Sequence, residues 1–160
     1  MSAVVLDTWL ALVNAATALS VAGGTLEGVT VVDGPRVTSE SDLDRLFIGV
    51  DMDPASLAAE GGDSPTGDEI VIHNETFAIV CTAESWSGSQ PISARRVRAF
   101  AIMDAVRPLL RPPGSPYPLG VKTLQSAWLG AWQLYQPQTS KGPYAGVSFR
   151  VECVARPSTT

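Results

Sequence analysis

The sequence predicts an α+β fold, with an antiparallel or mixed β-sheet of about five strands and two main helices packed on one face. Two segments, near residues 2–21 and 92–110, carry apolar residues at helical spacing. Residues 145–156 instead alternate between apolar and polar side chains, which is typical of a sheet covered on one face only. The chain of 160 residues shows no internal repeat and fits a single domain over residues 1–160.

The first helix is expected to start after Ser2, which can cap it, and to end near Leu19 or Val21, before Gly23 and Gly24. No Lys or Arg precedes its apolar run, and the run is too short to span a membrane. We therefore interpret it as a helix of a soluble protein rather than a signal peptide. Its apolar face is predicted to comprise Leu6, Trp9, Leu10, Val13 and Ala16.

Two strands are predicted next, over residues 29–32 and 45–52. Residues 51–69 follow, with six acidic side chains, no basic ones, and clusters of Gly, Pro and Ser. This composition predicts a long, exposed, acidic loop, and loops of such length usually have a function. The third strand is expected within residues 69–88.

The second helix is expected after Pro91, which suits a first helical turn, and before Pro112 and Pro113. Arg95 and Arg98 lie on or beside its apolar stripe, so each needs a partner, either an intramolecular carboxylate or another chain. The predicted buried stripe is Ala99, Ile102, Met103, Val106, Leu109 and Leu110.

Two further strands are predicted over residues 121–136 and 145–156. In the first, Trp128 and Trp132 share a parity with Gly130 between them, so a regular strand places them on one face, as core or as a contact surface. In the second, the inward positions are expected to be Ala145, Val147, Phe149, Val151, Cys153 and Ala155.

Catalytic and metal sites find little support in the sequence. On a straight strand His73 and Cys81 would lie about 27 Å apart, far beyond the roughly 3 Å that a base and a nucleophile require. Cys81 and Cys153 are expected to be small buried side chains. No spacing of Cys and His suits a metal, and no glycine-rich phosphate loop is present, so we expect no cofactor. The net charge of −5 argues against a nucleic-acid or anionic-membrane surface.

A resemblance to a known family rests on the order of these segments. The strand "ETFAIVCTAESWSGS" leads directly into the arginine-bearing helix "ISARRVRAFAIMDAVRPLLR", and the chain closes with "YPLGVKTLQSAWLGAWQLYQPQTSKGPYAGVSFRVECVAR". This pattern, from Leu6 to Arg156, resembles the tail terminator proteins of long-tailed, lambda-type bacteriophages of actinobacteria. The resemblance implies a non-enzymatic virion protein that forms a hexameric ring on the tail tube, ends its polymerisation and joins the tail to the head connector.

The resemblance also implies the partners: other copies of the chain, the major tail tube protein and the head–tail connector protein. DNA would pass through the channel without specific binding, in a virion tail assembled in the host cytoplasm. A different neck or minor tail component is the alternative, and a small enzyme or ligand-binding domain using His73 is a third. We expect Arg95 and Arg98 to pair either with a neighbouring subunit or, within the chain, with Glu84 or Glu152. The candidate subunit-interface residues are Arg95, Arg98, Asp51, Asp53, Glu60, Asp63, Trp128 and Trp132.

Overall fold

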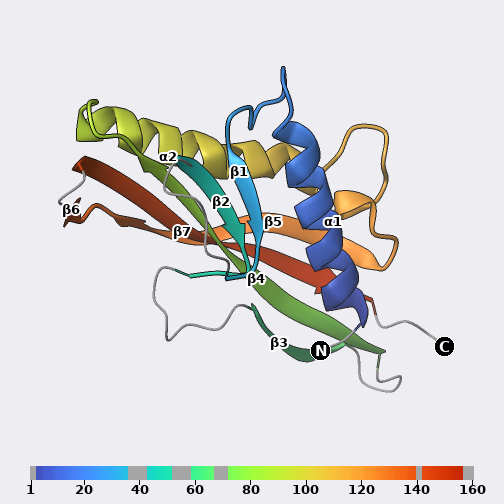
Figure 1. Cartoon of the computed structure of the whole chain (residues 1–160). Helices are drawn as coiled ribbons and strands as arrows, with labels where there is room; N and C mark the ends of the chain where they lie inside the picture. The colour runs from blue at the N-terminus through green and yellow to red at the C-terminus, as the bar shows by residue number, and fades with distance from the viewer. Residues whose placement is uncertain (1–2, 36–42, 52–58, 67–71, 140–141, 157–160) are drawn as a thin grey trace.

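The structure is a computed structural model that describes residues 3–35, 43–51, 59–66, 72–139 and 142–156 (Figure 1). Within these ranges, two α-helices and two short 3-10 helices accompany the strands of one mixed sheet. None of the described helices combines the length and the hydrophobicity that crossing a bilayer requires. In chain order the elements are α1 (Ala3–Leu19), β1 (Thr30–Asp33), β2 (Asp44–Ile48), β3 (Ala59–Thr66), β4 (Ile72–Trp86), α2 (Ile92–Val106), η1 (Arg107–Leu110), η2 (Pro118–Gly120), β5 (Leu124–Tyr135), β6 (Gln138–Thr139) and β7 (Gly142–Ala155).

The main strands lie in the order β1-β2-β4-β7-β5. β1 and β2 are parallel, and every other pair is antiparallel. The two long strands β4 and β7 form the middle of the sheet and pair continuously from Glu75↔Ala155 to Trp86↔Tyr144. This arrangement confirms the predicted α+β class with a mixed sheet.

Both helices pack on the same face of the sheet. α2 lies across β4 and β7, whereas α1 lies against β1 and β2 (Figure 1). Their buried side chains join the inward residues of the strands in a single core cluster. The predicted inward set of β7 is confirmed, since all six members are buried. The predicted stripe of α2 is also confirmed, with Leu109 only half-buried.

The predicted face of α1 is wrong in part: Ala16 is buried, and Trp9 and Val13 pack partly buried against the core, but Leu6 and Leu10 do not. Leu6 and Leu10 are exposed by 55% and 58%, and the side chains turned to the core are Val4, Val5, Thr8, Leu12 and Ala16. The helix is apolar on nearly every side, so spacing alone does not define which side is buried. A polar residue lies in the buried set because the Thr8 hydroxyl donates to the Val4 carbonyl oxygen at 2.7 Å. The capping role expected of Ser2 lies outside the described residues.

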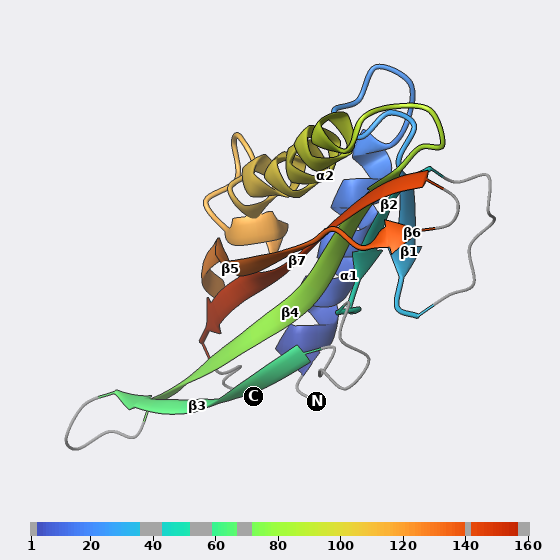
Figure 2. The same cartoon turned by 90° about the vertical axis from the view of Figure 1, so that its left-hand side faces the viewer.

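The loop predicted over residues 51–69 is wrong in part, because residues 59–66 form β3. This strand pairs antiparallel with β4 from Ala59↔Ile79 to Thr66↔Ile72. Its Gly and Pro content is unfavourable for a strand, but the long partner strand supplies the hydrogen bonds. The β3–β4 hairpin extends away from the body of the protein (Figure 2). The other parts of the predicted loop, residues 52–58 and 67–69, lie outside the described residues.

The sheet face opposite the helices is not fully open, contrary to the prediction of a sheet covered on one face only. Val50 and Asp51 lie over it: the Thr82 hydroxyl donates to the Val50 carbonyl oxygen at 2.7 Å, and the Ser148 hydroxyl donates to Asp51 Oδ1 at 2.7 Å. On this face Ala78, Val80, Thr82 and Ser148 are buried. We call it the outer face below.

Candidate subunit interface

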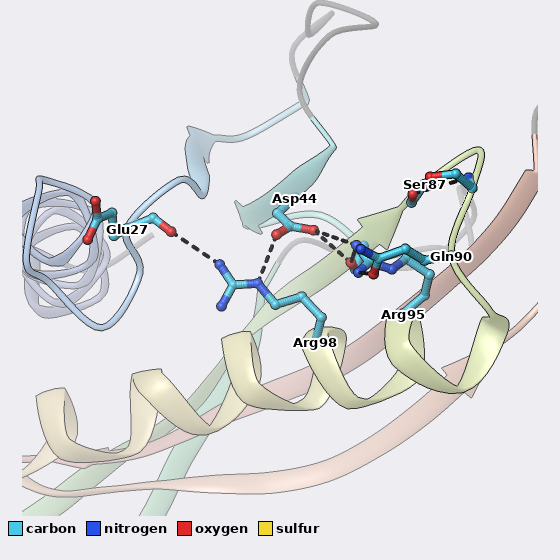
Figure 3. A network of polar contacts seen from close by, with 8 residues as sticks. Glu27, Asp44, Ser87, Gln90, Arg95 and Arg98 are labelled. Atoms are coloured by element: carbon cyan, nitrogen blue, oxygen red, sulfur yellow. Dashed lines mark hydrogen bonds and ion pairs between the residues drawn. The ribbon is translucent and has the colours of Figure 1, made fainter.

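Arg95 and Arg98 of α2 share one carboxylate, that of Asp44 at the start of β2 (Figure 3). Arg98 Nε donates to Asp44 Oδ2 at 2.8 Å, and Arg95 Nη1 lies 3.8 Å from Asp44 Oδ1. The Ser85 hydroxyl of β4 donates to Asp44 Oδ1 at 2.6 Å and accepts from Arg95 Nη1 at 3.1 Å. The network therefore joins α2 to two strands.

Further contacts extend this network along both arginines. Arg98 Nη2 donates to the Glu27 carbonyl oxygen at 3.2 Å, and Arg95 Nη2 donates to Gln90 Oε1 (Figure 3). Arg95 keeps only 13% of its side-chain surface exposed. Of the two partners that the sequence left open, the structure shows an intramolecular carboxylate, and it is Asp44 rather than Glu84 or Glu152. Sequence reasoning missed Asp44 because nothing in the linear pattern brings β2 beside α2.

Four candidate interface residues belong to the acidic region. Asp51 is half-buried on the outer face, where its Oδ1 accepts from the Ser148 hydroxyl at 2.7 Å. Glu60 and Asp63 are on β3, opposite Ala78 and Glu75 of β4. Asp53 lies outside the described residues. The structure thus places two of these carboxyl residues on the hairpin that extends from the body of the protein.

Trp128 and Trp132 lie on opposite faces of the sheet, so their predicted common face is wrong. Trp128 is opposite Glu152 of β7, on the outer face, whereas Trp132 is opposite the core residue Phe149. A register shift between Leu129 and Trp132 inserts one extra residue into β5, which reverses the alternation beyond it. The two indoles remain 46% and 53% exposed, and Trp132 also packs edge-on against Phe100 of α2.

The β5 strand forms one edge of the described sheet and carries no charged residue and no proline. Charges and prolines are the usual means by which monomeric proteins prevent an edge strand from pairing or packing with another chain. An uncharged edge of twelve residues with an exposed tryptophan on each face is therefore typical of a contact surface.

Charged side chains on the outer face are paired with one another. Arg45 Nε lies 3.1 Å from Glu84 Oε2, and the Tyr144 hydroxyl donates to Glu84 Oε1 at 2.8 Å. Burial and the neighbouring Glu84 charge raise the pKa of Tyr144, so its phenol stays protonated and acts as a donor. Arg150 Nε lies 3.5 Å from Glu152 Oε1, whose side chain occupies the space above Gly130.

A hollow on this face is lined by polar groups that are paired with one another. A polar hollow of about 290 Å³ opens beside Asp51, Ser148 and Arg150. Asp51 accepts from Ser148, and Arg150 pairs with Glu152, so these groups are engaged in structural contacts. Among the described residues, no group of three or more His, Cys, Asp or Glu side chains is arranged to hold a metal ion.

Cys81 and Cys153 are core side chains, as predicted. Cys81 is 1% exposed and Cys153 is 2% exposed, and neither forms a disulfide. Burial raises the pKa of each thiol to about 12, so both are protonated near neutral pH. A protonated buried thiol is a poor nucleophile. The backbone of His73 is on β4, opposite Pro65 and eight positions before Cys81.

The exposed side of α1 forms a second apolar surface that the sequence did not predict. A hollow of about 410 Å³ is lined by Leu6, Trp9 and Leu10 of α1 and by Asp33 of β1. The indole nitrogen of Trp9 donates to Asp33 Oδ1 at 2.7 Å, which fixes the ring at the end of the strand. We call this set the α1–β1 patch. The apolar character of the whole helix was visible in the sequence, but which side would be exposed was not.

Comparisons with known proteins find a similar fold among solved structures. The sequence matches no model of a known protein family and no curated protein. Among solved structures, it is similar to a chain of the "Virion of native gene transfer agent (GTA) particle", with a TM-score of 0.60 and 12% sequence identity. The similarity covers 98% of this chain and 100% of that chain. At this identity the likeness shows a shared fold over the full length of both chains.

Proposed function

We propose, from a fold shared along its whole length with a virion chain, that the protein is a structural component of a phage-like particle. More specifically, we propose that it is a tail terminator: a hexameric ring that caps the tail tube, ends its polymerisation and joins the tail to the head connector. The shared fold is the observation that carries the proposal. The coverage of 98% of this chain and 100% of that chain supports it, because the match is not confined to a supersecondary unit.

The surface chemistry is consistent with assembly rather than catalysis. The Asp44 network and the outer-face ion pairs occupy the charged groups that could form a reactive centre. The edge strand β5 has no charged residue and no proline, and with Trp128 and Trp132 it provides a surface for a protein partner. Glu60 and Asp63 are proposed to contact a neighbouring subunit or tail component through the β3–β4 hairpin. Asp53 is proposed as a further contact residue from the sequence. The net charge of −5 suits a channel that repels the phosphates of passing DNA.

Ring formation and termination can be tested with the purified chain and the tube subunit of the same particle. Native mass spectrometry and negative-stain microscopy are expected to show closed rings of six copies. When the tube subunit polymerises in vitro, sub-stoichiometric addition of the chain is expected to stop tube growth and shorten the length distribution. Tube lengths measured with an equal amount of bovine serum albumin provide the control.

Two results contradict the tail-terminator proposal in different ways. If the chain forms open tubes by itself, or copolymerises along the tube wall, it is a tube or connector subunit of the same fold. If it stays monomeric and leaves the tube lengths unchanged, it is not the ring that ends the tail.

A further inference from the structure

Two exposed apolar surfaces lie at opposite ends of the sheet. The α1–β1 patch lies at the β1 end, where Leu6 and Leu10 expose more than half of their surface. The β5 edge, with Trp128 and Trp132, lies at the other end of the order β1-β2-β4-β7-β5. Figure 2 shows β1 and β5 at opposite margins of the sheet. Two different exposed patches on opposite sides are what a head-to-tail contact requires.

The charges beside the two surfaces are of opposite sign. In α1 and β1, the only charged side chains are Asp7 and Asp33. β5 has none, and Glu152, which is opposite Trp128, is balanced by its ion pair with Arg150. The exposed Lys122 precedes β5, and the exposed Arg156 lies beside its start, with its backbone N–H donating to the Thr123 carbonyl oxygen at 2.9 Å. An acidic apolar patch and an apolar edge with basic flanks are complementary, which favours their association.

Self-association of either patch is less favourable than this contact. Two α1–β1 patches brought together would oppose the carboxylates of Asp7 and Asp33 with their own copies. Two β5 edges would bring Lys122 and Arg156 toward their counterparts or leave them unpaired. Like charges that face each other across an interface weaken it, so contacts between two identical patches are disfavoured.

We propose that the α1–β1 patch of one copy of this chain packs on the β5 edge of the next copy, in a repeated head-to-tail contact. This inference rests on the proposed ring and identifies its contact surfaces. The two tryptophans flank the edge strand from both faces, so the neighbouring α1 covers the edge between them. Leu6 and Leu10, one helical turn apart, are the side chains that fill this position.

The contact predicts a specific result for a mixture of two defective variants. Variant one carries Leu6→Glu and Leu10→Glu, and variant two carries Trp128→Gln and Trp132→Gln. Each variant alone is expected to lose ring formation, with self-association weakened by at least about 30-fold. Mixed in equal amounts, they retain one intact contact, between α1 of variant two and β5 of variant one. The mixture is therefore expected to form a one-to-one dimer and nothing larger, measured by native mass spectrometry.

Control variants distinguish the loss of the subunit contact from a loss of folding stability. Val97→Glu introduces the same charge at an α2 side chain that is 70% exposed and belongs to neither surface, and is expected to leave the ring intact. Circular dichroism and the unfolding midpoint check the fold of every variant. Trp132 packs on Phe100, so Trp128→Gln alone replaces the double variant if the latter does not fold.

Each outcome supports or overturns the proposed contact. If both variants still form rings, or if their mixture gives no dimer, the contact is wrong although the ring itself stands. If the wild-type chain forms no assembly at all, the proposed ring fails together with this contact. A dimer limited to the mixture supports both.

Discussion

At the scale of single residues, Asp44 is the carboxylate on which two arginines depend. Arg95 and Arg98 are both largely covered by the fold, and Asp44 is the acidic side chain paired with them. A charge reversal of these arginines would therefore damage the subunit itself. Their contribution to assembly has to be tested through neighbouring surfaces instead.

We expect Asp44→Asn to lower the free energy of unfolding by about 2 kcal/mol, because two partly buried guanidinium groups lose their counter-charge. Urea denaturation measures the change. The matched control is Asp104→Asn, which removes a carboxylate paired with Arg107 at 3.2 Å on the exposed side of α2. That pair is largely solvated, so its loss is expected to cost less than about 0.5 kcal/mol. Equal effects of the two substitutions would contradict the structural role of Asp44.

The two buried thiols predict a loss of stability in alkali. In the folded chain the pKa of Cys81 and of Cys153 is raised from 9.0 to about 12. Below pH 9 the thiols are protonated in both states, and folding is unaffected by their ionisation. Above pH 9 they ionise in the unfolded chain only, so stability falls as pH rises toward 12, by up to about 1.4 kcal/mol per pH unit for each thiol.

Denaturation curves at pH 7, 9 and 10 measure this slope. Lysine and tyrosine side chains titrate in the same range, so the comparison is with the double variant Cys81→Ala and Cys153→Ala. We expect the difference in the free energy of unfolding between the wild type and the double variant to shrink as pH rises above 9. An unchanged difference across this range would show that the thiols do not stay neutral in the folded chain.

At the scale of elements, α1 docks on the sheet through Trp9 and Gly49. Gly49 follows β2 with a φ of +84°, and a side chain there would place its Cβ in direct collision with the indole of Trp9. The turn therefore needs glycine both for its backbone and for the space that the indole occupies. This close approach holds the helix against the ends of β1 and β2.

We expect Gly49→Ala to lower the free energy of unfolding by about 3 kcal/mol, through backbone strain and displacement of the indole. Gly114→Ala is the control, because Gly114 has a φ of +77° and no heavy atom within 4 Å of an added Cβ. Its cost, about 1 kcal/mol, reports the backbone alone. Urea denaturation of both variants isolates the packing contribution of Trp9. Equal losses of stability in the two variants would mean that Gly49→Ala does not disturb the packing of the Trp9 indole.

The elements also show what the sequence can and cannot predict. β7 and α2 were predicted in detail because each has one buried face, and a single periodicity describes it. α1 is apolar on nearly all sides, so its burial depends on how it docks rather than on its pattern. β3 was missed because its Gly and Pro residues disfavour a strand, and only pairing with β4 compensates. The bulge in β5 has no local signal, and it alone separates Trp128 from Trp132.

At the scale of the whole molecule, electrostatic complementarity between the sheet ends predicts salt-dependent assembly. Asp7→Lys is expected to weaken self-association by about threefold, because rim charges contribute little individually. Adding Lys122→Glu to the same chain is expected to restore it, since a head-to-tail contact then pairs the two exchanged charges with each other. Sedimentation velocity at about 0.05 and 0.5 M salt measures both effects, and the wild type should associate less at the higher salt. Additive weakening in the double variant would contradict this pairing.

The unlike ends of the sheet have a consequence for the direction of an assembly. Contacts between identical patches relate two subunits by a two-fold axis, so the pair has no top or bottom. Contacts between the β1 end of one copy and the β5 end of the next keep every copy pointing the same way. A closed ring built in this manner has two chemically different faces, and each face can recognise a different neighbour. Such a ring can therefore accept a growing tube on one side and offer it no matching surface on the other.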